Sequence, residues 1–391
     1  MLQLLKKLNK SNFAVCFLII VFLSEFFTTI YLYVSDANSS RFTGVIKLVF
    51  FILFFILTKH SKNKITYYLL ALVLFFLFNQ FLFNPIFLLD PYWDITKGSI
   101  YYLIRYLYIL VFVAFFLNLK DKKIADNLLN IFKYVLVVNS IFILFGVLTE
   151  FKILTSYPRS LERFGSDGLF NKVNEVSHLY NILIANLYYN YIKSKKDLWL
   201  LLYIVVISTF LGTKTVLLFL SLLLIFHLTV IAKRKKIFRI ILCFIGVVFI
   251  LFFDKIMSFV FNLSPFWKEL TVKYDIFTLL FSKRDLLFIK VLEYFDTYWN
   301  KVNFLIGGSF YSRNFIFTQM DIVDVFIFFG GIGTIVYILF IIRYFSSNVN
   351  RFAIIIFSFV FFCGLLSGAL FLSVLSMIYL YLSLQNKKII C

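Results

Sequence analysis

The sequence predicts an all-α, polytopic integral membrane protein. Hydrophobic residues make up 62% of the 391 residues, and charged residues only 15%. Apolar runs follow one another from Phe13 to Leu384 with few breaks. Only helices and closed barrels satisfy their own backbone inside a bilayer, and these runs are too continuous for the alternating strands of a barrel. We therefore expect a single helical membrane domain over residues 1–391.

Hydropathy divides the chain into about twelve candidate spans, since a helix needs roughly 20 mainly apolar residues to cross a bilayer. These spans are expected near 13–34, 43–58, 65–83, 99–118, 128–149, 174–192, 198–211, 215–232, 237–253, 321–342, 352–369 and 371–385. The seventh and eighth are short because only the turn Gly212-Thr213-Lys214 separates them.

The basic residues predict the orientation, because Lys and Arg accumulate in cytoplasmic loops. With the N-terminus in the cytoplasm, every inside segment is net positive, as in KKLNK, KHSKNK, KSKKD and KRKK. An even number of spans then places the C-terminus in the cytoplasm as well. This topology accounts for much of the net charge of +20. Nucleic-acid binding, the usual interpretation of a strongly basic chain, is therefore not expected.

Two long segments fall on the outside, at 150–173 and 254–320. Long loops in compact proteins are usually functional or disordered. The larger loop is too rich in Phe, Leu, Trp and Tyr to be disordered by composition. From Arg284 onwards, its polar residues recur with a helical period. This pattern predicts an amphipathic helix that lies on the outer face of the membrane.

The candidate ligand-binding residues are mainly cations on the outer face. Arg binds phosphate through a planar fork and Lys binds it as a point charge, so Arg159, Arg163, Lys214 and Arg284 are candidates for a lipid-linked pyrophosphate. Solvation alone explains most loop charges. Arg284, however, begins the predicted surface helix, and a tight turn holds Lys214 at bilayer depth, where charges are costly. Arg105 is a further candidate, although snorkelling to the interface is enough to explain it.

Acidic and histidine side chains offer acid–base chemistry near the same face. Asp321 and Asp324 begin the span after the large loop, and either could accept a proton. Helix capping is the simpler explanation for both. His178, just inside the sixth span, could support the site or merely face a neighbouring helix. No nucleotide-binding, metalloprotease or serine-nucleophile motif is found, so neither a cofactor nor a metal is expected.

Three stretches carry a resemblance to a known family. They are STFLGTKTVLLFLSLLL at 208–224, SKRDLLFIKVLEYFDTYWNKVNFLIGGSF at 282–310 and MDIVDVFIFFGGIGTIVYILF at 320–340. In order and spacing they resemble the O-antigen polymerase (Wzy-type) and O-antigen ligase superfamily of bacterial surface-polysaccharide enzymes. The family's turn between two spans carries an arginine where this chain has Lys214. Its large loop has a helix-opening arginine, here Arg284, followed by a glycine pair, here Gly307 and Gly308.

The resemblance implies a polymerase of O-antigen or capsule type at the outer face of the bacterial cytoplasmic membrane. Such an enzyme transfers a glycan from undecaprenyl pyrophosphate to a sugar hydroxyl of a second lipid-linked repeat unit. Arg284 and Lys214 would bind the pyrophosphate, and Asp321 or Asp324 would accept the proton. Membrane lipid, a chain-length regulator and a flippase are the partners that the resemblance suggests.

Two departures from the family pattern affect this interpretation. Ligases of the group carry a histidine at the start of the span after the large loop, where this chain has Asp321 and Asp324, so a polymerase is favoured. Lys214 keeps the charge of the family's arginine but loses its fork. An O-antigen ligase-like glycan transferase remains one alternative.

A polysaccharide-lipid flippase or another transporter is the alternative from a different class. Carriers usually have short loops, internal repeats and substrate groups at the membrane midplane. In this chain one loop is much longer than the others, and the ionisable residues lie toward the outer face. A purely structural scaffold would leave Arg284 and Lys214 unexplained.

Overall fold

The fold is all-helical throughout the part of the chain that the computed structural model describes. That part comprises residues 10–35, 42–58, 64–81, 92–119, 123–156, 164–232, 235–252, 273–308 and 318–387, together with residues 255, 268 and 271.

Every predicted span is occupied by a helix. In the first part of the chain these helices are α2 (Lys10–Val34), α3 (Phe42–Thr58), α4 (Ile65–Phe81), α5 (Tyr92–Leu117), α6 (Lys123–Thr149), α7 (Val173–Ser194), α8 (Leu198–Thr209), α9 (Lys214–Phe226) and α10 (Lys235–Leu251). The later ones are α16 (Asp321–Phe345), α17 (Arg351–Ser367) and α18 (Val374–Gln385). Short elements connect them: η2 (Lys152–Leu154), η3 (His227–Ile231), α13 (Ile276–Leu280), α14 (Arg284–Tyr298) and α15 (Lys301–Ile306).

Among the described residues, five helical segments are long and apolar enough to cross a membrane by themselves, which is consistent with a helical membrane protein. They are Ser11–Val34, Gly98–Leu117, Lys123–Thr149, Lys214–Ile231 and Asp321–Phe345. The other predicted spans lie in helices that are shorter or more polar. A helix of that kind needs neighbouring helices to shield its polar side chains from lipid. The number of membrane crossings therefore stays a prediction.

Helix α7 is the centre of the bundle. Every residue from Glu175 to Tyr189 is buried, and α7 packs against α8, α9, α17 and α18. Residues 374–384 of α18 are buried in the same way. A helix that protein surrounds on all sides is shielded from lipid and can carry polar side chains such as Asn181 and Asn186, which explains why α7 is less apolar than the outer helices.

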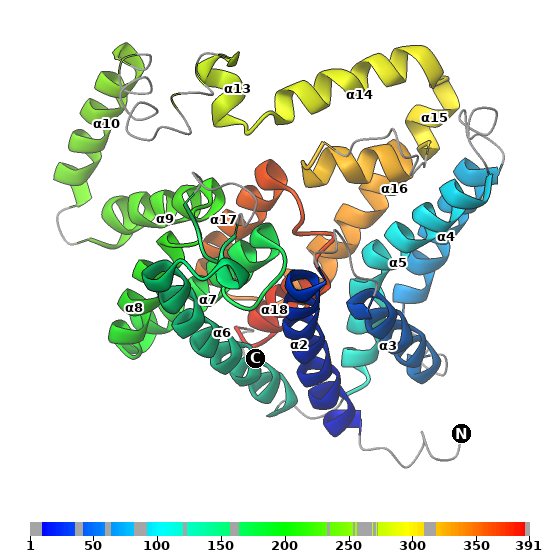
Figure 1. The fold of residues 1–391 in the computed structure, drawn as a ribbon, viewed down its shortest axis with the longest axis horizontal. Coiled ribbons are helices and arrows are strands. Elements are labelled where there is room, and N and C mark those ends of the chain that lie inside the picture. The colour runs from blue at the N-terminus through cyan, green and yellow to red at the C-terminus, as the bar shows by residue number, and fades with distance from the viewer. Residues whose placement is uncertain are drawn as a thin grey trace.

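Helix α14 confirms the predicted helix of the large loop, and it runs along the top of the view in Figure 1. Its buried residues Val291 and Phe295 form a small cluster with Trp299 and with Ile327 of α16. Most of its other apolar side chains are exposed. Besides these two apolar residues, α14 is attached to the bundle through Arg284 at its first position. A helix that otherwise largely exposes apolar and charged groups suits a membrane surface.

A kink in α16 joins the large loop to the bundle. Gly330 has φ 68° and ψ −175°, which interrupts the helix. The carbonyls before the break accept hydrogen bonds from elsewhere: Asn79 Nδ2 donates to Phe328 O at 2.8 Å, and Gly308 N donates to Ile327 O at 3.2 Å. The Gly307-Gly308 pair of the large loop therefore contacts the break in α16 at Gly330.

We expect Gly330→Ala to destabilise the protein. A Cβ at Gly330 would lie 2.3 Å from Gly307 N, and its backbone conformation, which essentially only glycine adopts, costs another residue about 1–3 kcal/mol. Gly331→Ala is the matched control, because its Cβ would meet nothing nearer than Phe304 O at 3.4 Å. The melting temperature of detergent-purified protein should fall for Gly330→Ala only. Equal melting temperatures for the two variants would contradict this role of the kink.

Candidate functional site

Three of the predicted site residues, Arg284, His178 and Asp321, meet at the turn between α17 and α18, residues 366–373. Helix α17 ends at Ser367, and Gly368 follows with φ 65°. A Cβ at Gly368 would lie 2.2 Å from Gln319 O, so only glycine fits this close approach. The turn closes at Ser373, whose side chain accepts a hydrogen bond from Ser376 N at the start of α18. Much of the turn is buried, so its backbone groups need partners from neighbouring helices.

Arg284 lies at the C-terminal end of α17. Its Nη1 donates to Leu366 O at 3.1 Å, and its Nη2 donates to Ser367 O at 2.8 Å. The last carbonyls of a helix have no partner in the helix and carry partial negative charge. These carbonyls compensate the arginine at the first position of α14. Asp285, the neighbouring acid, instead accepts a hydrogen bond from the Thr278 hydroxyl.

His178 of α7 reaches the same turn from the centre of the bundle. Its Nε2 lies 2.9 Å from Gly368 O and 3.2 Å from Ser367 Oγ, and the side chain is fully buried. With the proton on Nε2, the ring donates to the Gly368 carbonyl. His178 and Arg284 thus bind consecutive residues of one turn, which supports the predicted proximity of the two.

Asp321 holds the middle of the turn. Its Oδ2 accepts hydrogen bonds from Leu370 N at 3.0 Å and Phe371 N at 3.2 Å. Its Oδ1 is buried and has no hydrogen-bond partner within the described ranges, and the same is true of the hydroxyls of Tyr106 and Tyr337. Both tyrosines interact electrostatically with Asp321. Unpaired buried polar groups are costly, so this concentration of them marks a place where a substrate hydroxyl would find partners.

Asp324 is engaged differently. Its Oδ1 accepts hydrogen bonds from Thr318 N at 2.9 Å and from Thr318 Oγ1 at 2.7 Å. It thereby orders the segment that enters α16. The positive charge of Arg284 acts on Asp324, so the acid also lies within electrostatic reach of the turn.

Lys214 contacts the end of α13, just before α14, so its partners differ from those of Arg284. Its ammonium donates to Leu279 O and, at 3.5 Å, to Leu280 O. These are the last carbonyls of α13. Lys214 and Arg284 therefore anchor the two ends of the 279–284 segment, one to α9 and the other to α17. Arg159 and Arg163 lie outside the residues that the structure describes.

The smaller of the two predicted loops, at 150–173, packs on the turn that carries Lys214. Ser166 N donates to Phe210 O at 2.9 Å. Gly212, with φ 67°, lies so close to this loop that a Cβ at Gly212 would be 2.2 Å from Phe164 O. In the same loop, burial raises the pKa of the Asp167 carboxyl well above its ordinary value. The described part of this loop thus supports the Lys214 turn from one side.

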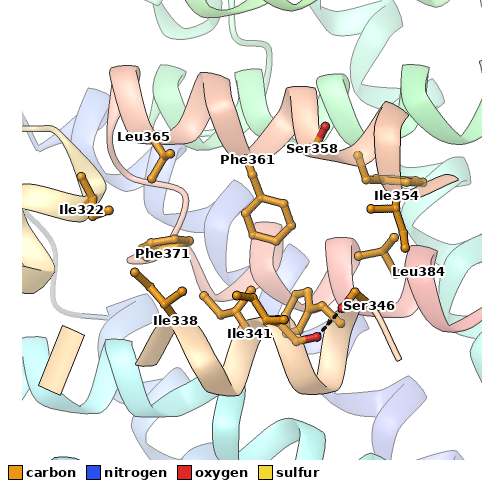
Figure 2. A pocket seen from close by; sticks show the side chains of 13 residues that line it. Ile322, Ile338, Ile341, Ser346, Ile354, Ser358, Phe361, Leu365, Phe371 and Leu384 are labelled. Atoms are coloured by element: carbon orange, nitrogen blue, oxygen red, sulfur yellow. Dashed lines mark hydrogen bonds between the residues drawn. The ribbon is translucent and has the colours of Figure 1, made fainter. Parts of the chain in front are cut away.

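An apolar groove of about 420 Å³ runs between α16 and α17 (Figure 2). Ile322 and Phe371 lie toward one end of the groove, and Ser346 and Leu384 lie toward the other (Figure 2). Ile322 follows Asp321 in α16, and the amide of Phe371 donates to Asp321. One end of the groove is therefore next to the polar site.

Sequence reasoning missed the α17–α18 turn itself. Residues 363–373 read CGLLSGALFLS, and this stretch looks like a brief interruption between two spans. The available signal was the Ser367-Gly368 pair at the end of an apolar run, which is typical of a helix end. This pattern does not indicate that Arg284, His178 and Asp321, which are distant in the sequence, bind the turn.

No family model matches the sequence, and no curated protein or solved structure matches it significantly. The resemblance to the polysaccharide-enzyme superfamily therefore rests on the quoted motifs alone.

We expect Asp321→Ala to destabilise the α17–α18 turn. The substitution leaves the amides of Leu370 and Phe371 without their acceptor, and each unpaired buried group costs about 1–3 kcal/mol. Asp321→Asn keeps one oxygen as the acceptor and should remain near wild-type stability. The measurement is the melting temperature of the purified protein. A wild-type value for Asp321→Ala would contradict this holding role.

Proposed function

We propose that the protein is a polysaccharide polymerase of O-antigen or capsule type. In this proposal it transfers an undecaprenyl-pyrophosphate-linked glycan to a second lipid-linked repeat unit at the outer face of the bacterial cytoplasmic membrane. The observation that carries the proposal is the convergence of Arg284, His178 and Asp321 on one buried turn at the base of a surface helix. A planar cation, an imidazole and a carboxylate with an unpaired oxygen are suitable groups for transfer from a phosphate leaving group.

The arginine suits the leaving group. The fork of Arg284 already spans two adjacent carbonyl oxygens at the end of α17. Two oxygens of a pyrophosphate could accept hydrogen bonds from the same guanidinium nitrogens. They would carry full negative charge, whereas the carbonyl oxygens of α17 carry only partial negative charge. Charge that develops on the departing pyrophosphate would be stabilised there. Lys214 would add a point charge at the base of α14, with Arg159 and Arg163 in support.

Asp321 suits the general base better than Asp324. Its Oδ2 is engaged with the turn, while its Oδ1 has no partner within the described residues. The hydroxyls of Tyr106 and Tyr337 would orient the acceptor sugar hydroxyl toward Oδ1. Asp324 also accepts two hydrogen bonds on one oxygen, both from Thr318. Unlike Asp321, it has no buried unpaired oxygen within the described residues.

The groove between α16 and α17 suits a polyprenyl chain. Its lining is almost entirely apolar, and one end is at Ile322, the residue that follows Asp321 (Figure 2). A lipid-linked pyrophosphate at Arg284 would extend its chain along this groove toward the opposite membrane face. Holding the lipid in this way would orient the anomeric carbon, and fixed orientation removes much of the entropic barrier to transfer.

The test of the proposed function is the surface polymer made by Arg284 variants. Arg284→Ala should reduce polymer at least about tenfold, the effect of 1.4 kcal/mol of lost transition-state stabilisation. Arg284→Lys should restore it only in part, because the ammonium lacks the fork. Lys290→Ala is the matched control, since Lys290 is an exposed cation on the same helix. Polymer is measured by gel, relative to protein abundance.

Abundance must be measured because Arg284 bonds two carbonyls of α17 and is not a freely solvated loop charge. Polymer of normal amount and length from Arg284→Ala would contradict the proposal. The lipid-linked pool separates the alternatives: a polymerase defect leaves single repeat units on the surface, whereas a flippase defect retains them on the cytoplasmic side.

We also propose the full topology of twelve spans with both termini in the cytoplasm. Asn171 and Ser194 are exposed and lie just before and at the end of α7. In a background without the native cysteines, Asn171→Cys should react with an impermeant thiol reagent on intact spheroplasts. Ser194→Cys should react only after lysis. The reverse pattern would overturn the orientation and the outer location of the site.

A further inference from the structure

A second set of charged side chains lies at the other end of the α17–α18 turn. Arg105 of α5 donates through Nε to Leu372 O at 2.9 Å. Glu175 of α7 accepts a hydrogen bond from Ser373 Oγ at 2.6 Å. Leu372 and Ser373 are adjacent, so a cation and a carboxylate from different helices meet where the turn enters α18. Arg284 and His178 bind the beginning of the same turn, at residues 366–368.

Three further charges join this pair. Lys47 of α3 forms an ion pair of 2.6 Å with Glu25 of α2 and also interacts electrostatically with Arg105 and Glu175. Lys172, which precedes α7, interacts with Arg105, Glu175 and Lys47. We call these five residues, which come from four helices and the end of the smaller loop, the second charge cluster: Glu25, Lys47, Arg105, Lys172 and Glu175.

The charges in the second charge cluster do not balance. It holds three cations and two carboxylates, and both carboxylates are buried. The pair of Lys47 with Glu25 and the hydrogen bonds of Arg105 and Glu175 have a clear structural role, because they join α2, α3, α5 and α7 to the turn. Lys172 has no such role: it is exposed and forms no ion pair within the described ranges.

Lys172 lies in the positive field of Arg105. Its pKa is lowered, and the first cause is the positive charge of Arg105. Repulsion between these two cations is relieved if an anion lies between them. An excess positive charge close to lipid is costly without a counter-charge. A phosphate group would supply that charge, and both Arg and Lys are suited to bind it.

We propose that the second charge cluster binds the phosphate group of a second lipid-linked molecule, with Lys172, Arg105 and Lys47 as its ligands. This inference rests on the proposed function, in which donor and acceptor are both lipid-linked. Arg284 then binds the donor pyrophosphate at one end of the α17–α18 turn, and the second charge cluster binds the acceptor at the other. Asp321 bonds the middle of the turn, between the two.

The test is the number of polyprenyl phosphates that the purified protein binds. In nanodiscs of zwitterionic lipid, the wild type should bind two equivalents of farnesyl pyrophosphate. Lys172→Gln should bind one, and Lys172→Arg should bind two. Arg284→Ala should also bind one, and the double variant none. Lys152→Gln is the matched control, because it removes an exposed cation from the same outer loop.

The outcomes separate this inference from the proposed function. Unchanged stoichiometry in Lys172→Gln would overturn the second site, whether or not Arg284→Ala abolishes polymer. Normal polymer from Arg284→Ala, with one equivalent lost in Lys172→Gln, would overturn the polymerase and keep the second site. If inorganic pyrophosphate occupies the Lys172-dependent site with equal affinity, the ligand is a free anion and the lipid-linked acceptor is wrong.

Discussion

The hydrogen bonding of the α17–α18 turn is the constraint on which the rest of the site depends. Backbone groups that are buried inside a membrane protein cannot form hydrogen bonds with water, so each needs a hydrogen-bond partner from the protein. Side chains from α5, α7, α14 and α16 supply these partners along residues 366–373. A single turn thereby orders charged groups that are distant in the sequence.

This arrangement gives the same residues structural and chemical roles. Arg284 caps the end of α17, and the donors that bind its carbonyls are those that would bind a pyrophosphate. Asp321 binds the turn through Oδ2 and interacts electrostatically with Tyr106 and Tyr337. A substrate that displaces or joins such contacts would change how the turn is held, which couples binding to the position of α14.

Glycine positions determine how the outer elements attach to the bundle. Gly330 breaks α16 and lets Gly308 and Asn79 use the released carbonyls. Gly368 allows the turn to approach Gln319. In the first case a backbone segment of the large loop contacts the break in α16, and in the second it contacts the end of α17, so close backbone approach helps to position the loop.

Hydropathy and charge were sufficient to predict helical spans and the helix that begins at Arg284, because apolar length and helical period are local properties of the chain. They did not predict the kink at Gly330 or the site at residues 366–373. The second charge cluster was missed for the same reason. Its members are scattered from Glu25 to Glu175, and only the packing of α2, α3, α5 and α7 brings them together. Long-range contacts of this kind leave no periodic signal in the sequence, so the tertiary structure alone decided which charges share a site.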